Sequence, residues 1–401
     1  MSEQIKVITF GDLMERGVLE IGDGYRAKLE ELGGDDGPFF LRAGLLVELG
    51  FDWASAERFR DDVLLKVRSK LGQPGDTMVT TKGNSVGRAA YVPPGAPEFV
   101  YSPHLSYWRS VDSSRLSPGF LRYWSRSPEF SAQLGSMAHG TDMAPYLSLA
   151  DQRRLRISLP PIFIQEAIAE VLESLDNKIA VNENITRTCD QLRAANLHCW
   201  IKSNPGMVKG CPLSSVAKFV NGRPFTKDAT GAGRVVIRIA EINSGPGLST
   251  VRNDIEVPSA HLARPGDVLF AWSGSLVVAR WFRPEGIINQ HIFKVIPNTG
   301  IPVWLVFELV NTKLAVFKSI AAGKATTMGH IQRQHLDELV DVPVRESIPE
   351  LDDALQPLWD RALTAEQESL KLAELRDTLL PRLMSGEIQV RDAGKAVEEV
   401  T

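Results

Sequence analysis

The sequence carries one turn-and-strand stretch twice, and this duplication constrains the fold more than any other feature. "QPGDTMVTTKGNSVG" occupies 73–87 and "RPGDVLFAWSGS" occupies 264–275, so that Asp76 and Asp267 stand 191 positions apart. A Pro-Gly-Asp triplet is a common turn signal that also recurs by chance, so this pair alone does not establish a repeat.

Three further pairs of identical residues lie around it at slowly decreasing offsets. They are Arg42 and Arg238 at 196, His104 and His291 at 187, and Pro160 and Pro343 at 183. A steadily shrinking offset fits a duplication whose first copy has longer loops, and a repeat of this length is a whole domain rather than a solenoid unit. A chain of 401 residues is long enough for each copy to bury its own core.

Each copy ends in a stretch with apolar residues at three- and four-residue steps, which predicts a long amphipathic helix. The first has some forty residues, roughly 60 Å at 1.5 Å per residue, and stops at Pro205 and Gly206. The second continues the 183 offset through the pairs Leu175/Leu358, Leu192/Leu375 and Arg193/Arg376. The two helices therefore belong to the repeat.

The apolar stripe of each helix needs a cover, and the other helix of the same chain is the simplest one, in an antiparallel pair. Pro357 predicts either a kink in the second helix or its true start. The residues expected to pack between the helices are Ile168, Leu172, Leu175, Ile179, Leu192, Leu355, Leu358, Leu372, Leu375 and Leu379.

Between the helices the sequence has short β runs such as "RVVIRIAEI", cut by Gly and Pro, together with helical stretches. We therefore expect an α+β chain with two similar globular domains, separated by a pair of long antiparallel, coiled-coil-like helices and related by an internal pseudo-twofold. The expected boundaries are 1–158 and 206–345 for the domains, 159–205 and 346–390 for the helices, and 391–401 for an acidic C-terminal tail.

The composition, 43% hydrophobic and 23% charged, is typical of a soluble globular protein. No run approaches the roughly 18 apolar residues of a membrane span, and "MSEQIKVITFGD" lacks the layout of a signal peptide. These features predict a cytoplasmic protein without a membrane partner. Cys189, Cys199 and Cys211 are interpreted as ordinary thiols, with no metal site.

Two motifs of catalysis are missing from the sequence. It has no phosphate-binding Gly-x-x-x-x-Gly-Lys-Ser/Thr loop and no Asp/Asn-Pro-Pro-aromatic motif of adenine methylation. His104 and His291 are the best candidates for an enzyme, but a duplicated histidine is more often a hydrogen-bonded structural residue, and neither has a triad partner at a matching offset. Trp272, Arg42 and Arg238 are interpreted as structural.

The net charge of −4 hides an uneven distribution. Basic and acidic residues number 19 and 20 over 1–158, 16 and 10 over 206–345, and 6 and 13 over 346–401. Phosphate neutralisation therefore favours nucleic-acid binding by the second domain more than by the first. Four loops have the composition of base readers, although each also fits a solvated turn: "GYRAK" (24–28), "TTKGNSVGR" (80–88), "NGRPFTK" (221–227) and "AAGKATTMGHIQR" (321–333).

The chain resembles the specificity subunits of type I restriction-modification systems, the HsdS family, over nearly its whole length. In the second domain the resemblance is carried by "NGRPFTKDATGAGRVVIRIAEIN", "PGDVLFAWSGSLVVARW", "INQHIFKVIP" and "ATTMGHIQRQHLDELVDVPV". In the helices it is carried by "LPPIFIQEAIAEVLESLDNKIAVNENI" and "LAELRDTLLPRLMSGEIQV", and in the first domain by "GDGYRAK", "VYSPHLSYWR" and "APYLSLADQRRLRISLPP".

This resemblance implies a function without catalysis by the chain itself. Each globular domain would be a target recognition domain for one half of a bipartite, asymmetric double-stranded DNA site, and the helices would fix the spacer between the halves. Two methyltransferase subunits, which use S-adenosylmethionine, would dock on the chain and methylate an adenine in each half, and a translocase-nuclease subunit would join them. The chain itself would bind no cofactor.

The residues expected to contact DNA are Lys82 and Arg88 in the first domain and Arg223, Lys227, Lys324 and Arg333 in the second, with Tyr25, Tyr146 and His330 as lesser candidates. Two other functions stay open at this point. One is a free-standing DNA-modifying enzyme, and the other is a helical assembly scaffold without base readout.

Overall fold

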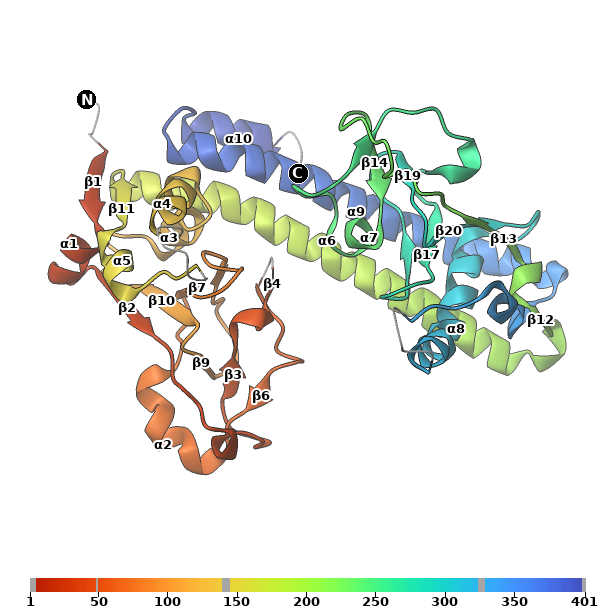
Figure 1. The fold of residues 1–401 in the computed structure, drawn as a ribbon, viewed down its shortest axis with the longest axis horizontal. Helices are drawn as coiled ribbons and strands as arrows, with labels where there is room; N and C mark the ends of the chain where they lie inside the picture. Colours follow the sequence, from red (N-terminus) through yellow and green to blue (C-terminus); the bar gives the residue numbers. More distant parts are fainter. Residues whose placement is uncertain (1–4, 48–49, 139–144, 324–328, 399–401) are drawn as a thin grey trace. The chain divides into compact units, whose positions relative to one another are not determined.

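The computed structural model describes residues 5–47, 50–138, 145–323 and 329–398 (Figure 1). The chain divides into two compact units, of which unit 1 is Met1–Asn177 with Leu372–Thr401 and unit 2 is Lys178–Lys371. Each unit contains a globular part and the helix segments on which that part packs. The units thus divide both long helices, whereas the expected boundaries give each helix a segment of its own.

Unit 1 is built around a four-stranded antiparallel sheet in the order β2-β10-β7-β8. Three strands in the order β6-β3-β9 form a second sheet, in which β3 and β9 are parallel. The strands are β1 (Lys6–Thr9), β2 (Leu19–Asp23), β3 (Phe39–Leu41), β4 (Leu46–Val47), β5 (Gly50–Phe51), β6 (Glu57–Arg58), β7 (Thr77–Thr80), β8 (Ala89–Tyr91), β9 (Phe99–Tyr101), β10 (Leu105–Ser110) and β11 (Arg156–Leu159). The helices of this part are α1 (Phe10–Glu15), α2 (Leu64–Val67), α3 (Pro118–Trp124), α4 (Pro128–Ala138) and α5 (Leu149–Arg154).

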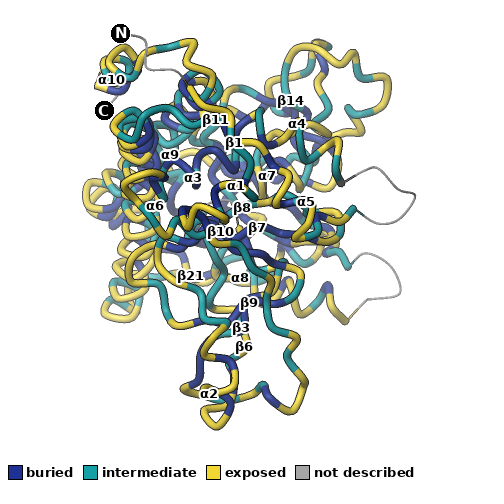
Figure 2. The backbone as a smooth tube through the Cα atoms, turned by 90° about the vertical axis from the view of Figure 1, so that its left-hand side faces the viewer, coloured by how far each residue is buried: buried dark blue, intermediate teal, exposed yellow. Residues whose placement is uncertain are grey.

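An aromatic cluster joins the sheet of unit 1 to its helices. The ring centroid of Trp108 on β10 lies 5.1 Å from that of Phe10 on α1 and 5.2 Å from that of Phe130 on α4. The indole N–H of Trp108 donates to Gln152 Oε1 at 2.9 Å, so its one polar group is satisfied in the core. Figure 2 shows buried backbone around α1, α3 and β10 and exposed residues along the outer loops.

Unit 2 repeats this design. Its four-stranded antiparallel sheet has the order β13-β20-β17-β18, and a second sheet has the order β15-β14-β19-β16, in which β14 and β19 are parallel. The strands are β12 (Val208–Pro212), β13 (Ala217–Asn221), β14 (Arg234–Ile237), β15 (Arg252–Asn253), β16 (Leu262–Ala263), β17 (Val268–Ala271), β18 (Val277–Arg280), β19 (Gly286–Ile288), β20 (Ile292–Pro297) and β21 (Leu339–Pro343). The helices of this part are α7 (Ile239–Ser244) and α8 (Val303–Ala322).

Equivalent strands of the two four-stranded sheets are separated in the sequence by the predicted offsets. β7 and β17 begin at Thr77 and Val268, 191 positions apart, and β10 and β20 begin at Leu105 and Ile292, 187 positions apart. Each unit also has a two-stranded ribbon, β1-β11 in unit 1 and β12-β21 in unit 2. The predicted α+β fold with two similar domains is therefore confirmed, and the sequence repeat is a structural repeat.

The long helices are α6 (Ile162–Ser203) and α9 (Ile348–Met384), and they run antiparallel within each unit. In unit 1, Asp176 on α6 pairs with Arg376 on α9 at 2.8 Å. In unit 2, Lys178 pairs with Glu368 at 3.5 Å, while Thr186, further along α6, donates to the carbonyl of Ala362, which lies earlier on α9. None of the described helices is long and apolar enough to cross a membrane.

Most residues expected between the helices are buried or partly buried. Those with at most 4% exposure are Ile168, Leu172, Leu175, Ile179, Leu355, Leu372 and Leu379, and Leu358 and Leu375 are half-buried. Leu192 is the exception, because its side chain is 47% exposed. Its neighbour Arg193 is fully buried instead, so the expected packing role of Leu192 is wrong.

Two features near the end of the chain refine the expected helices. α9 begins at Ile348 and continues through Pro357, so of the two alternatives for this proline, a kink or a helix start, the start is excluded. Pro349 occupies its first turn, where a missing N–H costs no intrahelical hydrogen bond. The expected acidic tail contains a further helix, α10 (Val390–Glu398), which buries Ala393 and Val397.

Candidate functional site

Four segments of unit 2 meet where the strands of its four-stranded sheet end. The amide of Gln290 donates to the carbonyl of Arg223 at 3.0 Å, which joins the segment before β20 to the loop after β13. The amide of Trp272 donates to the carbonyl of His291, and that of Ile331 donates to the carbonyl of Trp272, both at 3.1 Å. The segments therefore lie side by side in the order 221–223, 289–292, 272–274 and 329–331.

Unit 1 repeats this arrangement with its own four segments. The amide of Tyr25 donates to the carbonyl of Tyr101 at 2.7 Å, that of Thr81 to His104 at 2.9 Å, and that of Leu147 to Thr81 at 3.0 Å. The order is 24–25, 101–105, 80–83 and 145–147, which corresponds segment by segment to unit 2. We call this arrangement, defined by these segments in each unit, the four-segment site.

One glycine in each unit, Gly24 or Gly222, fixes the first segment of its site, and neither was among the predicted site residues. A Cβ on Gly24 would lie 2.1 Å from the carbonyl oxygen of Ser102, and a Cβ on Gly222 would lie 2.1 Å from that of Asn289. Real Cβ atoms do not approach this closely, so only glycine lets these backbones meet. The available signal was their common place in "GDGYRAK" and "NGRPFTK", at an offset of 198.

The side chains at the tips differ between the units although their backbones correspond. In unit 1 the Lys82 ammonium lies 5.0 Å from the centre of the Tyr146 ring, and Tyr146 is 47% exposed. In unit 2 the corresponding backbone bridge joins Ser273 to His330, whose ring lies 6.3 Å from that of Trp272. The same scaffold thus presents a cation beside a phenol in one unit and imidazole beside indole in the other.

Of the remaining candidates in unit 1, Arg88 is exposed, but its Nη1 donates to the carbonyl of Leu46 at 3.1 Å. The hydroxyl of Tyr25 donates to Glu31 at 2.9 Å. The backbone N–H of Lys28 and the ammonium of Lys66 lower the pKa of Glu31 to about 2, so this carboxylate stays a charged acceptor. The Tyr25 hydroxyl is therefore held inside unit 1.

In unit 2, Arg223, Lys227 and Arg333 are exposed. Arg333 also donates through Nη2 to the carbonyl of Phe219 at 3.5 Å, a long contact at the limit of a hydrogen bond. Lys324 lies outside the described residues. The structure thus brings Arg223 and His330 into the four-segment site, while Lys227 and Arg333 extend the same loops.

The residues interpreted as structural have partners within their own unit. Arg42 pairs with Glu57 at 2.5 Å, and Arg238 pairs with Glu241 at 2.6 Å. The indole N–H of Trp272 donates to Asn221 Oδ1 at 2.8 Å, and its ring lies 5.3 Å from that of His291. Trp272 therefore supports the site as well as packing on the core.

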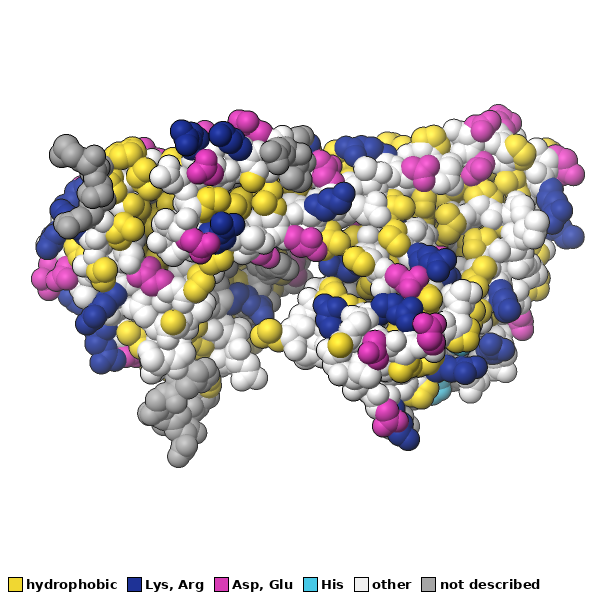
Figure 3. All heavy atoms as spheres, turned by 90° about the horizontal axis from the view of Figure 1, so that it is seen from above, with side chains coloured by type: hydrophobic (Ala, Val, Ile, Leu, Met, Phe, Trp, Pro, Cys, Tyr) yellow, Lys and Arg dark blue, Asp and Glu magenta, His cyan; other side chains and the backbone are white. Residues whose placement is uncertain are grey.

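The tips of both sites offer N–H donors, positive charges and aromatic faces, which are the groups that contact phosphates and base edges. These donors, charges and rings suit binding more than bond making. On the face drawn in Figure 3, Lys and Arg side chains lie among Asp and Glu side chains.

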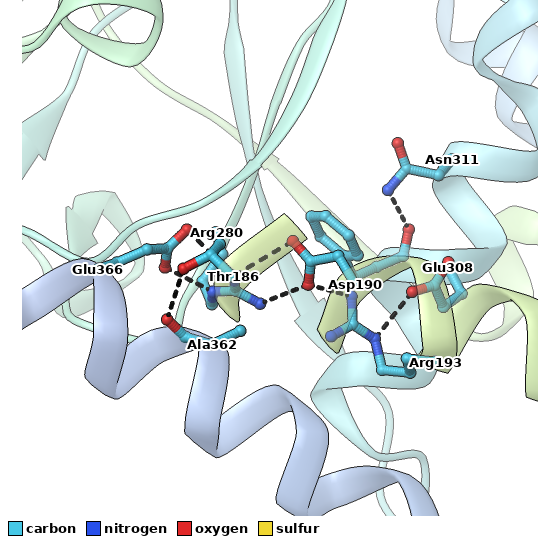
Figure 4. Close-up of polar contacts among 9 residues, drawn as sticks. Thr186, Asp190, Arg193, Arg280, Glu308, Asn311, Ala362 and Glu366 are labelled. Carbon is cyan, nitrogen blue, oxygen red and sulfur yellow. Dashed lines mark hydrogen bonds and ion pairs between the residues drawn. The ribbon is translucent and has the colours of Figure 1, made fainter. Parts of the chain in front are cut away.

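A network of buried and partly buried charges anchors the sheet of unit 2 to both long helices (Figure 4). Arg280, at the end of β18, donates to Glu366 on α9 at 2.7 and 3.0 Å and to Asp190 on α6 at 3.2 and 3.4 Å. Arg193 on α6 donates to Glu308 on α8 at 2.8 Å. Burial raises the pKa values of Glu308 and Glu366, and the arginines beside them oppose that change.

No family model matches the sequence, and no curated protein sequence matches it either. Solved structures do match. The S subunit of a type I restriction-modification system from M. genitalium is 14% identical, with a TM-score of 0.57 over 95% of this chain and 96% of that one. This likeness shows the fold.

Two further structures match over nearly the whole chain with lower geometric agreement. The HsdS subunit from Thermoanaerobacter tengcongensis is 15% identical over 96% of this chain and 97% of that one, with a TM-score of 0.37. A chain from work on the assembly and conformational transition of the type I R-M system is 17% identical over 96% and 98%, with a TM-score of 0.39.

Proposed function

We infer, from the fold that the chain shares with type I S subunits, that it is the DNA-specificity subunit of a type I restriction-modification complex. Each four-segment site reads one half of a bipartite, asymmetric site in double-stranded DNA. The chain performs no bond-making step itself. It docks two methyltransferase subunits, which bind S-adenosylmethionine and methylate an adenine in each half, and a translocase-nuclease subunit joins them.

One observation carries this proposal: the two units present different side chains on corresponding backbones. Tyr25 and Arg223 take equivalent places next to the fixed glycines, and Lys82 and Ser273 take equivalent places in the third segment. A duplicated scaffold with different tips suits a two-part code, because base edges are read by side chains whereas the scaffold only places them.

The first test exchanges one globular domain for that of a related subunit. Replacing residues 206–345 with the second domain of another type I specificity subunit should change one half of the methylated sequence and leave the other half and the spacer unchanged. Sequencing of methylated adenines in cells that carry each version measures both halves at once. The reciprocal exchange of residues 1–158 is the control and should change only the other half. A change in both halves from either exchange would contradict the proposal that each domain recognises its half-site independently.

The second test concerns the spacer, which we propose is set by α6 and α9. Seven residues inserted into each helix, after Asn177 and after Lys371, preserve the helical phase and lengthen each helix by about 10 Å. This corresponds to about three base pairs at 3.4 Å each. The accepted spacer should therefore grow by about three base pairs while both half-sites stay the same, as read from the methylated sequences.

The matched control places the same seven residues at Gly95, in the exposed turn 93–95 of unit 1. That insertion should leave the spacer as it is in the natural chain. If the lengthened helices still selected the original spacer, the helices would not determine it.

A further inference from the structure

Some equivalent positions of the two units carry the same residue, although the two copies differ at most other positions. For each such pair, the structure can be searched for a reason why both copies have the same residue. Asp76 and Asp267 have a structural reason to stay the same. Their carboxylates accept the amides of Gln73 and Arg264 at 2.8 and 2.7 Å and close the turn before β7 and β17.

The glycine pairs have structural reasons as well. Gly24 and Gly222 leave no room for a Cβ, as described above. Gly83 and Gly274 have φ of 82° and 67°, in the left-handed region that favours glycine. For each of these pairs, the fold itself explains why both copies keep the same residue.

His104 and His291 lack such a reason. Their backbone carbonyls accept the amides of Thr81 and Trp272, a task that any residue performs. Both side chains are exposed, and among the described residues neither imidazole has a hydrogen bond or ion pair, although the His291 ring contacts Trp272. His291 has φ of 75°, but His104 does not share this conformation, so backbone strain does not explain the pair.

The two histidines occupy the middle of the four-segment site. Each stands in the second segment and is directly hydrogen-bonded to the third, and the contact with the first segment lies three residues before His104 and one residue before His291. Lys82 follows Thr81, whose amide contacts His104, and the carbonyl of Arg223 accepts the amide of Gln290, the residue before His291. An exposed imidazole is therefore presented at the same central point in both units, surrounded by tips that differ.

We propose that His104 and His291 each donate a hydrogen bond to a phosphate of the DNA backbone, one in each half of the site. This inference rests on the proposed function. Two half-sites of different sequence share the sugar-phosphate backbone and the target adenine, and the adenine is the substrate of the methyltransferase subunits. A residue kept in both domains of this chain therefore matches the backbone, whereas the differing tips match the bases. Imidazole carries an N–H donor in both its neutral and its charged form.

The test uses the full chain assembled with its methyltransferase subunits and a duplex that contains its methylated sequence. The variants His104→Ala and His291→Gly remove the imidazoles, and glycine suits the positive φ at 291. Each should weaken binding about tenfold, which corresponds to about 1.4 kcal/mol. The loss should be the same on duplexes with a single base pair changed in either half. His198→Ala, on the exposed face of α6, is the matched control and should bind as the natural chain does.

Rescue and phosphate mapping separate a direct contact from a general loss of structure. His104→Gln and His291→Asn retain an N–H donor and should regain part of the affinity. In duplexes with single neutral methylphosphonate linkages, one linkage in each half should weaken binding of the natural chain. It should cause no further loss for the variant that lacks the corresponding histidine.

Three results would overturn the proposal. The first is an unchanged affinity in both His104→Ala and His291→Gly. The second is a loss of affinity that depends on the base sequence of the duplex. The third is a loss from the variant that adds in full to the loss from a methylphosphonate at every position tested. A natural complex with no preference among DNA sequences would instead refute the proposed function, and that result is seen before any variant is made.

Discussion

Replacing Arg280 with alanine should lower the free energy of unfolding by about 2–3 kcal/mol, because the partly buried carboxylates of Glu366 and Asp190 lose the hydrogen bonds to their shared cation. The Arg280 side chain is only 2% exposed and joins the sheet of unit 2 to Glu366 and Asp190. Its guanidinium also lies 4.5 Å from the centre of the Trp359 ring on α9. Urea unfolding of the natural chain and the variant at pH 7 measures the difference.

The decrease in unfolding free energy caused by Arg280→Ala should become smaller as the pH is lowered. Burial raises the pKa of Glu366 in the folded chain above its ordinary value. The folded state therefore takes up a proton at higher pH than the unfolded state, and acidification towards pH 5 stabilises it relative to the unfolded state. Without Arg280 this effect should strengthen, because the opposing positive charge is gone.

The control is Arg264→Ala, which removes an exposed ion pair with Glu285 in the same unit. Exposed pairs contribute little because water and salt screen them, so this variant should unfold much like the natural chain. An Arg280→Ala variant as stable as Arg264→Ala would show that the network in Figure 4 does not anchor the sheet to the helices.

The repeat was predictable because its signals are local. The Pro-Gly-Asp turn that ends in Asp76 or Asp267 is capped by its own carboxylate within three residues, so the motif fixes the start of β7 and β17 wherever it occurs. The offsets then placed β10 and β20 as well. Fold class and helix pairing follow from such short-range patterns.

The misplacement of Leu192 had a cause that no local pattern contains. Apolar spacing placed Leu192 on the packed stripe, but the buried face at this point continues through Cys189, Arg193 and Leu197. A buried arginine is tolerated only with a partner, and here the partner is Glu308, which lies 115 positions away. Sequence periodicity cannot show such a distant compensation.

The candidate site could be predicted only in part, because contacts between residues far apart in the sequence assemble it. Loop composition located the segments with Lys82 and Arg223, but not which residues meet, because the meeting depends on hydrogen bonds between strands far apart in sequence. The commitment of the Tyr25 hydroxyl to Glu31 depends on a 3-10 turn at residues 29–31, and a side-chain pattern does not reveal it. The central place of His104 and His291 likewise appears only in the assembled sheet.

Unit 1 has its own buried anchor, with an aspartate at a place where unit 2 has a tryptophan. Asp176 on α6 accepts from Arg122 at 2.6 Å, from the hydroxyl of Tyr123 at 2.9 Å and from Arg376 on α9 at 2.8 Å. At the 183 offset its counterpart is Trp359. Counted from the starts of α3 and α8, the counterpart of Arg122 is Phe307, whose ring lies 5.3 Å from that of Trp359. Arg193, the counterpart of Arg376, lies 5.1 Å from the Trp359 ring centre.

Asp176→Ala should therefore cost about 3–5 kcal/mol of unfolding free energy, since two largely buried guanidiniums lose the carboxylate between them. The double variant Asp176→Trp with Arg122→Phe removes one of the two unpaired cations and places an indole beside the other, so it should recover at least half of this loss. In it Arg376 faces an aromatic ring, as Arg193 does, although without a counterpart of Glu308, and a desolvated cation over an indole is worth about 2 kcal/mol. Urea unfolding of the natural chain, the single variants and the double variant measures the recovery. A double variant no more stable than Asp176→Ala would mean that the two anchors, although equivalent in position, are not interchangeable, because each reader depends on its own surrounding side chains.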